Sequence, residues 1–178
     1  GEEMKLITGG ARSGKSTFAE SLMADFNKVC YIATARPSDD KEMKERIEKH
    51  RARRPDHWHT LEGDRLLSSK ISAVDGVLLD CVTVLLSNYL YDSGEELSEA
   101  SIQKVEEAVK KELTNLADFC DKEKIELVLV TNEVGSGIVP MHPLTRAFRD
   151  IQGRVNQYLA FRAEEVYLVV SGIPVKIK

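Results

Sequence analysis

The chain has 178 residues, 42% hydrophobic content and a formal net charge of -4, which is enough apolar material for one ordinary domain with its own core. The mildly acidic balance argues against broad nucleic-acid binding, because that binding depends on neutralising phosphates with cationic side chains. No apolar run reaches the roughly 20 residues that a membrane span requires, and a strand pattern starts at once, so neither a membrane span nor a signal peptide is expected.

The three cysteines form no metal-binding motif, and we interpret them as core thiols in a reducing cytoplasm. Residues 1–3 are either a cloning remnant or a short native extension.

Short apolar runs alternate with helical patterns along the chain. Several runs are apolar at every position, which is typical of parallel strands covered on both faces. The predicted strands are residues 4–8, 29–34, 76–81, 125–131 and 166–170. The predicted helices are residues 15–24, 39–54, 83–91, 98–122 and 143–162. This alternation predicts a single α/β domain over residues 1–178, with a mostly parallel central sheet and helices on both faces.

The first strand leads directly into Gly9-Gly10-Ala11-Arg12-Ser13-Gly14-Lys15-Ser16, which fits the phosphate-loop pattern G-x-x-x-x-G-K-[ST]. Glycines let the backbone N–H groups turn toward phosphate oxygens, and the helix that follows adds its positive end. Lys15 is expected to contact the β and γ phosphates, and Ser16 to bind Mg²⁺. The alternative is a Gly-rich turn that matches by chance, which the strand before it and the helix after it argue against. The loop therefore predicts binding of ATP or GTP with Mg²⁺.

The predicted helix at residues 39–54 carries one histidine among several arginines. Arg46, His50 and Arg54 are spaced four apart and would line one face, with Met43 and Ile47 packed beside them. Arginine forks match phosphate oxygens. Nearby cations favour a neutral imidazole, which could attack an α-phosphate. Composition alone leaves a second interpretation open, in which the helix is a solvated basic face.

Asp80 ends an apolar run, residues 77–80, that has the form of a Walker B strand. It could bind Mg²⁺ directly or through water, and the alternative is a helix-capping aspartate ahead of Thr83. Ligands of such sheets bind at the carboxyl ends of the strands. Thr34, Asp80 and Glu133 are therefore expected on the same rim as the phosphate loop. Glu133 could orient a hydroxyl or a metal, or simply order its own loop.

The remaining polar side chains give weaker signals. His57 and His59 flank Trp58 in a short strand pattern and are interpreted as structural, whereas His142 lies in a Pro-rich loop and receives no assignment. Surface solvation or contact with a large substrate could each explain Arg149, Arg154 and Asn156.

Several of these motifs together resemble the bifunctional adenosylcobinamide kinase/adenosylcobinamide-phosphate guanylyltransferase family of cobalamin assembly. The matching segments are TGGARSGKS (8–16), YIAT (31–34), ERI..H..RRP.HW (45–58), VLLDCVT (77–83), LVTNEVGSGIVP (129–140), FRDIQGRVNQ (148–157) and VSGIPVKIK (170–178). They span nearly the whole chain in order, and the histidine helix and the TNEVG.GIVP segment are more specific than the phosphate loop.

The resemblance implies a RecA-like P-loop fold and two reactions. ATP or GTP phosphorylates adenosylcobinamide, and GTP then donates GMP to the new phosphate, with pyrophosphate as the second product. It implies that His50 carries GMP covalently. With the phosphate-loop argument above, the predicted catalytic residues are His50 and Lys15, and the predicted Mg²⁺ ligands are Ser16 and Asp80. The implied nucleotide contacts are Gly9, Gly10, Ala11, Arg12, Ser13, Gly14, Lys15, Ser16, Ala33, Thr34, Ala35, Arg51, Ala52, Arg53, Arg54, Glu62 and Asp80. Glutamate is common at position 80 in the family pattern, so the aspartate here reaches less far by one methylene.

The resemblance also implies a cytoplasmic homotrimer whose partners are adenosylcobinamide, its phosphate and the nucleotides. A corrinoid is large and flat, so we expect it to bind at a subunit boundary. Two alternatives share the phosphate loop. One is a simple P-loop small-molecule kinase without a covalent intermediate, which leaves the arginine-flanked His50 unexplained. The other is a non-enzymatic nucleotide-binding module of RecA-like type.

Overall fold

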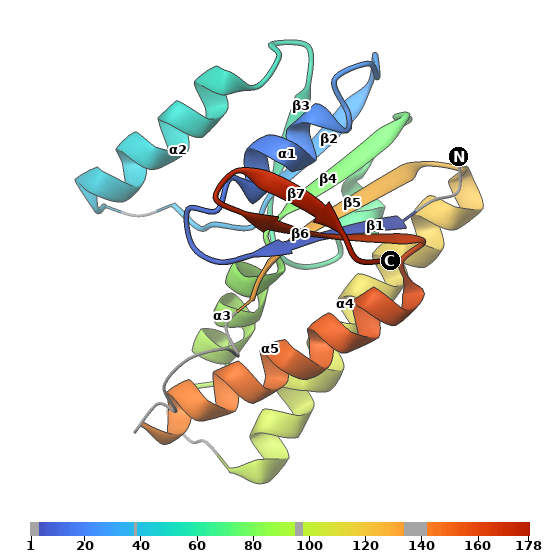
Figure 1. Cartoon of the computed structure of the whole chain (residues 1–178). Helices are drawn as coiled ribbons and strands as arrows, with labels where there is room; N and C mark the ends of the chain where they lie inside the picture. Colours follow the sequence, from blue (N-terminus) through green and yellow to red (C-terminus); the bar gives the residue numbers. More distant parts are fainter. Residues whose placement is uncertain (1–3, 38, 95–97, 134–141) are drawn as a thin grey trace.

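The computed structural model describes residues 4–37, 39–94, 98–133 and 142–178. A seven-stranded sheet runs through this part of the chain in the order β3-β2-β4-β5-β1-β6-β7 (Figure 1). Every neighbouring pair is parallel except β6 and β7, so the predicted mostly parallel α/β sheet is confirmed. The strands are β1 (Met4–Gly9), β2 (Val29–Ala33), β3 (His59–Glu62), β4 (Gly76–Asp80), β5 (Glu126–Asn132), β6 (Glu165–Val170) and β7 (Ile173–Lys176).

Helices cover both faces of the sheet, which explains why the central strands are apolar at successive positions. On one face, Ile7 of β1 packs in a cluster with Ala19 and Met23 beside α1. On the other face, Leu6 belongs to a larger cluster that α3, α4 and α5 complete (Figure 1). Burying one such aliphatic side chain contributes roughly 1.5–3 kcal/mol. The helices are α1 (Lys15–Ser21), α2 (Lys41–Arg53), α3 (Val82–Asp92), α4 (Glu99–Glu123) and α5 (Pro143–Arg162), with a 3-10 turn at Leu67–Lys70.

Most predicted boundaries lie within two residues of the observed ones, and α5 has the predicted bounds. The exception is α1, which ends at Ser21 instead of residue 24. Residues 22–25 form turns, and the N–H groups of Met23 and Ala24 donate to carbonyls three residues back rather than four. The tighter turns close the helix early and lead the chain into β2.

Helix α2 differs from the prediction in its packing. It begins after Asp40, whose carboxylate accepts a hydrogen bond from the N–H of Glu42 at 3.0 Å. Within α2, all of whose residues are described, no side chain is buried, and Met43 is 39% exposed. The predicted packing of Met43 beneath the helix is therefore wrong. Arg54 is extended because Pro55 follows it, so Arg54 leaves the predicted helical row of Arg46 and His50.

Two strands at the sheet edges were missed or misplaced. β3 starts at His59, so His57 and the buried Trp58 lie in the turn ahead of it. β7 was not predicted, and it joins β6 through a two-residue turn, Ser171-Gly172, in which both residues have positive φ. A Ser-Gly pair between apolar runs is a hairpin signal that could have revealed this strand.

Candidate active site

The phosphate loop connects the carboxyl end of β1 to the first turn of α1. Gly14 adopts φ 92°, a left-handed conformation that glycine tolerates, and its carbonyl accepts the N–H of Phe18 at 3.1 Å. A Cβ atom on Gly9 would lie only 2.6 Å from Oγ of Ser13 and 2.7 Å from the carbonyl oxygen of Val169. The sequence pattern therefore reflects two steric requirements, one at each end of the loop.

Other parts of the chain brace this loop. The N–H of Gly172, in the β6–β7 turn, donates to the carbonyl of Ser13 at 2.6 Å. The N–H of Glu133, just after β5, donates to the carbonyl of Gly9 at 2.9 Å. The loop is thus held from two sides by backbone contacts, and its shape is fixed independently of most of its side chains.

Lys15 is half-buried at the start of α1, and its ammonium group donates to the carbonyl of Gly10 at 2.9 Å. Burial lowers the pKa of Lys15, while electrostatic interactions with Cys81 and Asp80 act in the opposite direction. β1, which leads to Lys15, and β4, which ends at Asp80, both run parallel to β5 as its two neighbours, so the two residues lie at the same edge of the sheet. The structure thus brings together Lys15 and Asp80, as the sequence predicted.

Asp80 does not cap a helix, because the residue at the N-cap of α3 is Cys81 and its side chain makes no capping bond. The carboxylate of Asp80 instead accepts a hydrogen bond from the hydroxyl of Tyr31 at 2.9 Å. Burial and the nearby Asp80 carboxylate raise the pKa of Tyr31, which keeps this phenol protonated as the donor. The capping alternative is therefore wrong, and Asp80 presents a carboxylate at the carboxyl end of β4.

This donor set suits Mg²⁺ in one respect. A carboxylate from Asp80 and a hydroxyl from Ser16, which is half-buried in the first turn of α1, are both hard oxygen ligands. Within the described ranges there is no group of three or more His, Cys, Asp or Glu side chains that could hold a metal.

His50 is half-buried near the C-terminal end of α2. Its Nδ1 atom lies 3.1 Å from Nη2 of Arg53, and Arg53 in turn binds Glu20 of α1. Burial lowers the pKa of His50 and the charge of Arg53 lowers it further, against opposing effects of Asp80 and Glu20. The ring is therefore biased toward its neutral, nucleophilic form. Its nearest charged neighbours lie on α1, α2 and β4.

The arginines around His50 have different partners. Arg51 pairs with Glu62 at 3.2 Å, and both side chains are more than half exposed. Arg54 is 8% exposed and places its guanidinium 3.7 Å from the centre of the Tyr31 ring. Arg54 is thereby linked through Tyr31 to Asp80, whereas Arg51 and Glu62 form a separate pair on the surface. Ala52, which follows Arg51 in the chain, is exposed.

The predicted contacts at residues 33–35 lie at the carboxyl end of β2. Thr34 is 1% exposed, and its hydroxyl donates to the carbonyl of Cys81 at 2.9 Å while accepting the N–H of Cys81 at 2.9 Å. The carbonyl of Ala33 accepts the N–H of Gly63 at 3.1 Å. These bonds tie β2 to its neighbours, so the Thr34 hydroxyl is engaged inside the protein, and Ala35 beside it is half-buried.

Residues at the end of β5 and along α5 have mainly structural partners. His142 caps α5, with Nδ1 accepting the N–H of Leu144 at 3.1 Å. Arg154 binds Glu106 at 2.7 Å, and Asn156 accepts from the hydroxyl of Thr131 at 2.7 Å. His142 thus has a capping role that the sequence did not assign, and Arg154 and Asn156 are bound within the chain, so the predicted contact with a large substrate stays a prediction. Glu133 is exposed, Arg149 lies 3.5 Å from Asp150, and residues 134–140 of the TNEVG.GIVP segment fall outside the described residues.

Three residues of this region were not singled out from the sequence: Glu20, Tyr31 and Gly172. Tyr31 is the one aromatic residue in β2, and a phenol in an aliphatic strand is a signal that a polar partner lies nearby. Glu20 is a charged residue on the packed side of α1, 9% exposed, which is equally informative because buried carboxylates are normally paired. Gly172 gave only the Ser-Gly turn signal.

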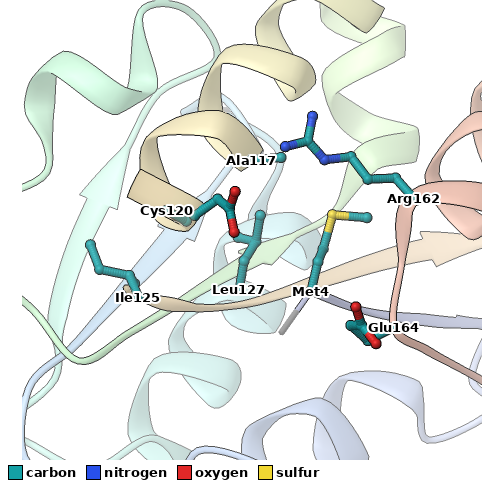
Figure 2. Close-up of a pocket in the computed structure, with 8 residues that line it drawn as sticks. Met4, Ala117, Cys120, Ile125, Leu127, Arg162 and Glu164 are labelled. Atoms are coloured by element: carbon teal, nitrogen blue, oxygen red, sulfur yellow. The ribbon is translucent and has the colours of Figure 1, made fainter. Parts of the chain in front are cut away.

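A separate cavity of about 210 Å³ lies at the opposite end of the sheet, where β1 and β5 begin (Figure 2). Figure 2 shows Met4, Leu127 and Ile125 on its strand side, with Arg162 and Glu164 at its border. None of the predicted nucleotide contacts lines it. The cavity therefore belongs to the packing of α4 and α5 on the sheet and not to the phosphate-loop rim.

The cysteines are free thiols, with Cys30 and Cys120 buried and Cys81 half-buried. Burial raises the pKa of Cys30 and of Cys81 to about 11, and that of Cys120 to about 12. All three are therefore protonated near neutral pH, as expected for unreactive core residues. In the described part of the chain, no helix combines the length and apolarity needed to cross a bilayer.

Comparison with known proteins adds a family to this geometry. Residues 5–177 match the family model for cobinamide kinase / cobinamide phosphate guanyltransferase. The chain is 51% identical over 181 aligned positions to the bifunctional adenosylcobalamin biosynthesis protein CobU of Escherichia coli, covering 98% of this chain and 99% of the relative. It is 48% identical to the protein of the same description from Salmonella typhimurium, with 98% and 99% covered. It is also 40% identical to the CobP protein of Pseudomonas aeruginosa, with 97% and 96% covered. The chain therefore belongs to the cobinamide kinase / cobinamide phosphate guanyltransferase family.

Proposed function

We propose that the chain is a bifunctional enzyme of cobalamin assembly. It phosphorylates adenosylcobinamide with ATP or GTP, and then transfers GMP from GTP to adenosylcobinamide phosphate through a guanylyl-His50 intermediate. The family and its full-length similarity support both activities. The observation that carries the proposal is a half-buried His50 with a lowered pKa, linked through Arg53 to Glu20 of the helix that leaves the phosphate loop.

In the kinase half, residues 9–16 hold the triphosphate with backbone N–H groups, and Lys15 neutralises charge on the β and γ phosphates. Ser16 and Asp80 would hold Mg²⁺, which when bound supplies further neutralisation of the phosphate charge. Phosphoryl transfer depends mainly on positioning and charge stabilisation. A loop fixed by Gly172 and Glu133 suits that requirement.

In the transferase half, the lone pair of the neutral His50 ring forms a bond to the α-phosphorus of GTP. The bond from that phosphorus to its bridging oxygen breaks, and pyrophosphate leaves with the electron pair. An oxygen of adenosylcobinamide phosphate then attacks the same phosphorus, and the nitrogen–phosphorus bond breaks to restore the ring. Residues 51–54 and Lys15 offset the charge that develops on the transferring group.

We also infer a single RecA-like P-loop domain, a cytoplasmic location and a homotrimer that binds the corrinoid at a subunit boundary. The phosphate loop and the parallel sheet support the domain assignment, and the family resemblance supports the trimer. Light scattering after size exclusion should give about three times the 19.9 kDa chain mass. A mass equal to one chain would reject the trimer.

The covalent step can be tested with GTP labelled at the α-phosphate. Incubation with Mg²⁺ and denaturation should leave label on the wild type, in a bond that acid breaks and alkali preserves. The His50→Ala variant should bind GTP and phosphorylate adenosylcobinamide but retain no label. Equal labelling of both proteins would reject His50 as the carrier and point to another residue. No label on the wild type would leave a simple kinase without a covalent intermediate.

A further inference from the structure

Glu20 links the phosphate-loop helix to the histidine helix. Its carboxylate lies on α1 and is almost completely buried, with 9% of the residue exposed. Both oxygens are used, since Oε2 accepts from Nε of Arg53 at 3.0 Å and Oε1 accepts from Nη2 at 3.2 Å. A two-pronged contact of this kind fixes the plane of the guanidinium as well as its distance.

The guanidinium fixed by Glu20 also contacts the imidazole. Nη2 of Arg53 lies 3.1 Å from Nδ1 of His50. A guanidinium carries only donors and does not lose a proton in proteins, so Nδ1 must be the acceptor. In the neutral ring the remaining proton then resides on Nε2, and the lone pair is on Nδ1. The contact therefore selects one of the two imidazole tautomers.

We propose that Glu20 is a positioning residue for guanylyl transfer: through Arg53 it fixes the His50 ring relative to the phosphate-loop helix and holds it in the Nε2–H tautomer. This inference rests on the proposed function, because it presumes that His50 carries GMP. Nη1 of Arg53 takes part in neither contact and lies on a group already next to the lone pair. Attack by Nδ1 requires Nη2 of Arg53 to release this lone pair, and Nη1 and Nη2 can then donate to an oxygen of the α-phosphate while Nε keeps its bond to Glu20.

The charged groups around His50 allow a prediction of how its pKa changes when one of them is removed. Arg53 and Arg54 face the ring from the end of α2, Glu20 from α1 and Asp80 from β4. The arginines lower the pKa of His50, and the two carboxylates raise it. Loss of the Glu20 charge should therefore lower this pKa further, whereas loss of the Arg53 charge should raise it.

The kinetic test compares Glu20→Gln with Glu48→Gln, which removes one exposed carboxylate from α2 itself. At saturating GTP, Glu20→Gln should slow adduct formation about 10-fold to 100-fold, the effect expected of a nucleophile displaced by about 1 Å. Its KM for GTP and its phosphorylation rate should change less than about 3-fold, and Glu48→Gln should behave as the wild type. Equal adduct rates in Glu20→Gln and wild type would overturn the proposal.

The pH test separates positioning from a loss of fold. The acid limb of the adduct-formation rate should move to lower pH in Glu20→Gln and to higher pH in Arg53→Met, because only the unprotonated ring attacks. A structural defect would lower the rate in each variant, but it would not move the acid limb of Glu20→Gln to lower pH and that of Arg53→Met to higher pH. Identical limbs in all three proteins would count against the proposal, and Glu20→Asp should recover part of the wild-type rate.

The tautomer is observed directly by NMR of ¹⁵N-histidine-labelled protein, with the His50 signal assigned by its absence in His50→Gln. Wild type should show His50 with its proton on Nε2, and Glu20→Gln should show a mixture. A proton on Nδ1 in the wild type would contradict the inference. This measurement does not depend on adduct formation. It therefore tests the effect of Glu20 on the His50 tautomer even if labelled GTP forms no adduct with His50 and the proposed function is rejected.

Discussion

At the residue scale, the phosphate loop shows that its three glycines are not equivalent. Gly9 lacks room for a side chain, Gly14 needs a left-handed backbone, and Gly10 has nothing within 4 Å of a Cβ atom. The motif alone treats all three as one signature. Their separate roles become visible only when the neighbours that lie far away in sequence are in place.

The contrast between Gly9 and Gly10 yields a matched pair of variants. Gly9→Ala would bring its Cβ to 2.7 Å from the backbone oxygen of Val169, which cannot rotate away, so β1 or β6 must shift. We expect a loss of about 1–3 kcal/mol in the free energy of unfolding, the usual cost of overpacking. Gly10→Ala should be within about 0.5 kcal/mol of wild type. Urea denaturation of both variants measures the difference, and equal losses would contradict this account.

At the element scale, the helices are positioned by different forces. α4 and α5 bury apolar faces against the sheet, whereas α2 buries nothing and is joined to the rest by Arg53–Glu20, Arg51–Glu62 and the stack of Arg54 on Tyr31. Of these contacts the exposed pair Arg51–Glu62 contributes little stability, about 0–1 kcal/mol, and none of the three adds to the apolar core. Substitutions that stabilise the core should therefore leave the placement of α2 largely unaffected.

The long helix α4 offers a test of local capping. The hydroxyl of Ser98 accepts the N–H of Ser101 at 3.1 Å, and the hydroxyl of Ser101 accepts the N–H of Ser98 at 3.0 Å. Ser98→Ala should lower the free energy of unfolding by about 1 kcal/mol, because one N–H of the first turn loses its acceptor. Chemical denaturation reports the change. Ser68→Ala, outside this cap, serves as the control, and an unchanged midpoint for Ser98→Ala would show that the cap is redundant.

Much of the fold could be predicted because the strands of the central sheet are apolar throughout and each helix has its own start or stop signal. The G-x-x-x-x-G-K-[ST] pattern and the arginine-flanked His50 could be singled out for the same reason, as local sequence patterns, and their roles stay predictions. β7 could not be found by periodicity, since it is four residues long, contains Pro174 and is exposed. Arg54 was misplaced because Pro55 overrode helical spacing, and Glu20 was passed over because its partner is 33 residues away.

At the scale of the whole molecule, segments that are distant in sequence contact the phosphate loop. β1 and α1 form it, the segment after β5 binds Gly9, and the β6–β7 turn binds Ser13. Six parallel strands also end on that rim, so the site is supported by nearly the entire sheet. Ligand binding at this rim should therefore stabilise the whole fold against unfolding, and not one part of it alone.

This connectivity predicts a global response to nucleotide. GTP with Mg²⁺ at 100 times its Kd should stabilise the protein by about 2.7 kcal/mol, if the unfolded chain has no affinity for it. Thermal unfolding should stay a single transition and move upward as a whole. Lys15→Met should lose most of the shift, whereas Lys28→Met, an exposed lysine at the start of β2, should keep it. Two separate transitions would contradict the picture of one connected unit.

The hydrogen bond from Gly172 to Ser13 has a consequence for the order in which the site matures. On a ribosome, the glycine-rich loop emerges early, whereas the turn that braces it is synthesised late. A growing polypeptide must therefore carry an unsupported anion nest through most of its synthesis. We therefore expect tight nucleotide binding to develop late in biogenesis, after the last hairpin has closed, and not to guide the folding of the first βα unit.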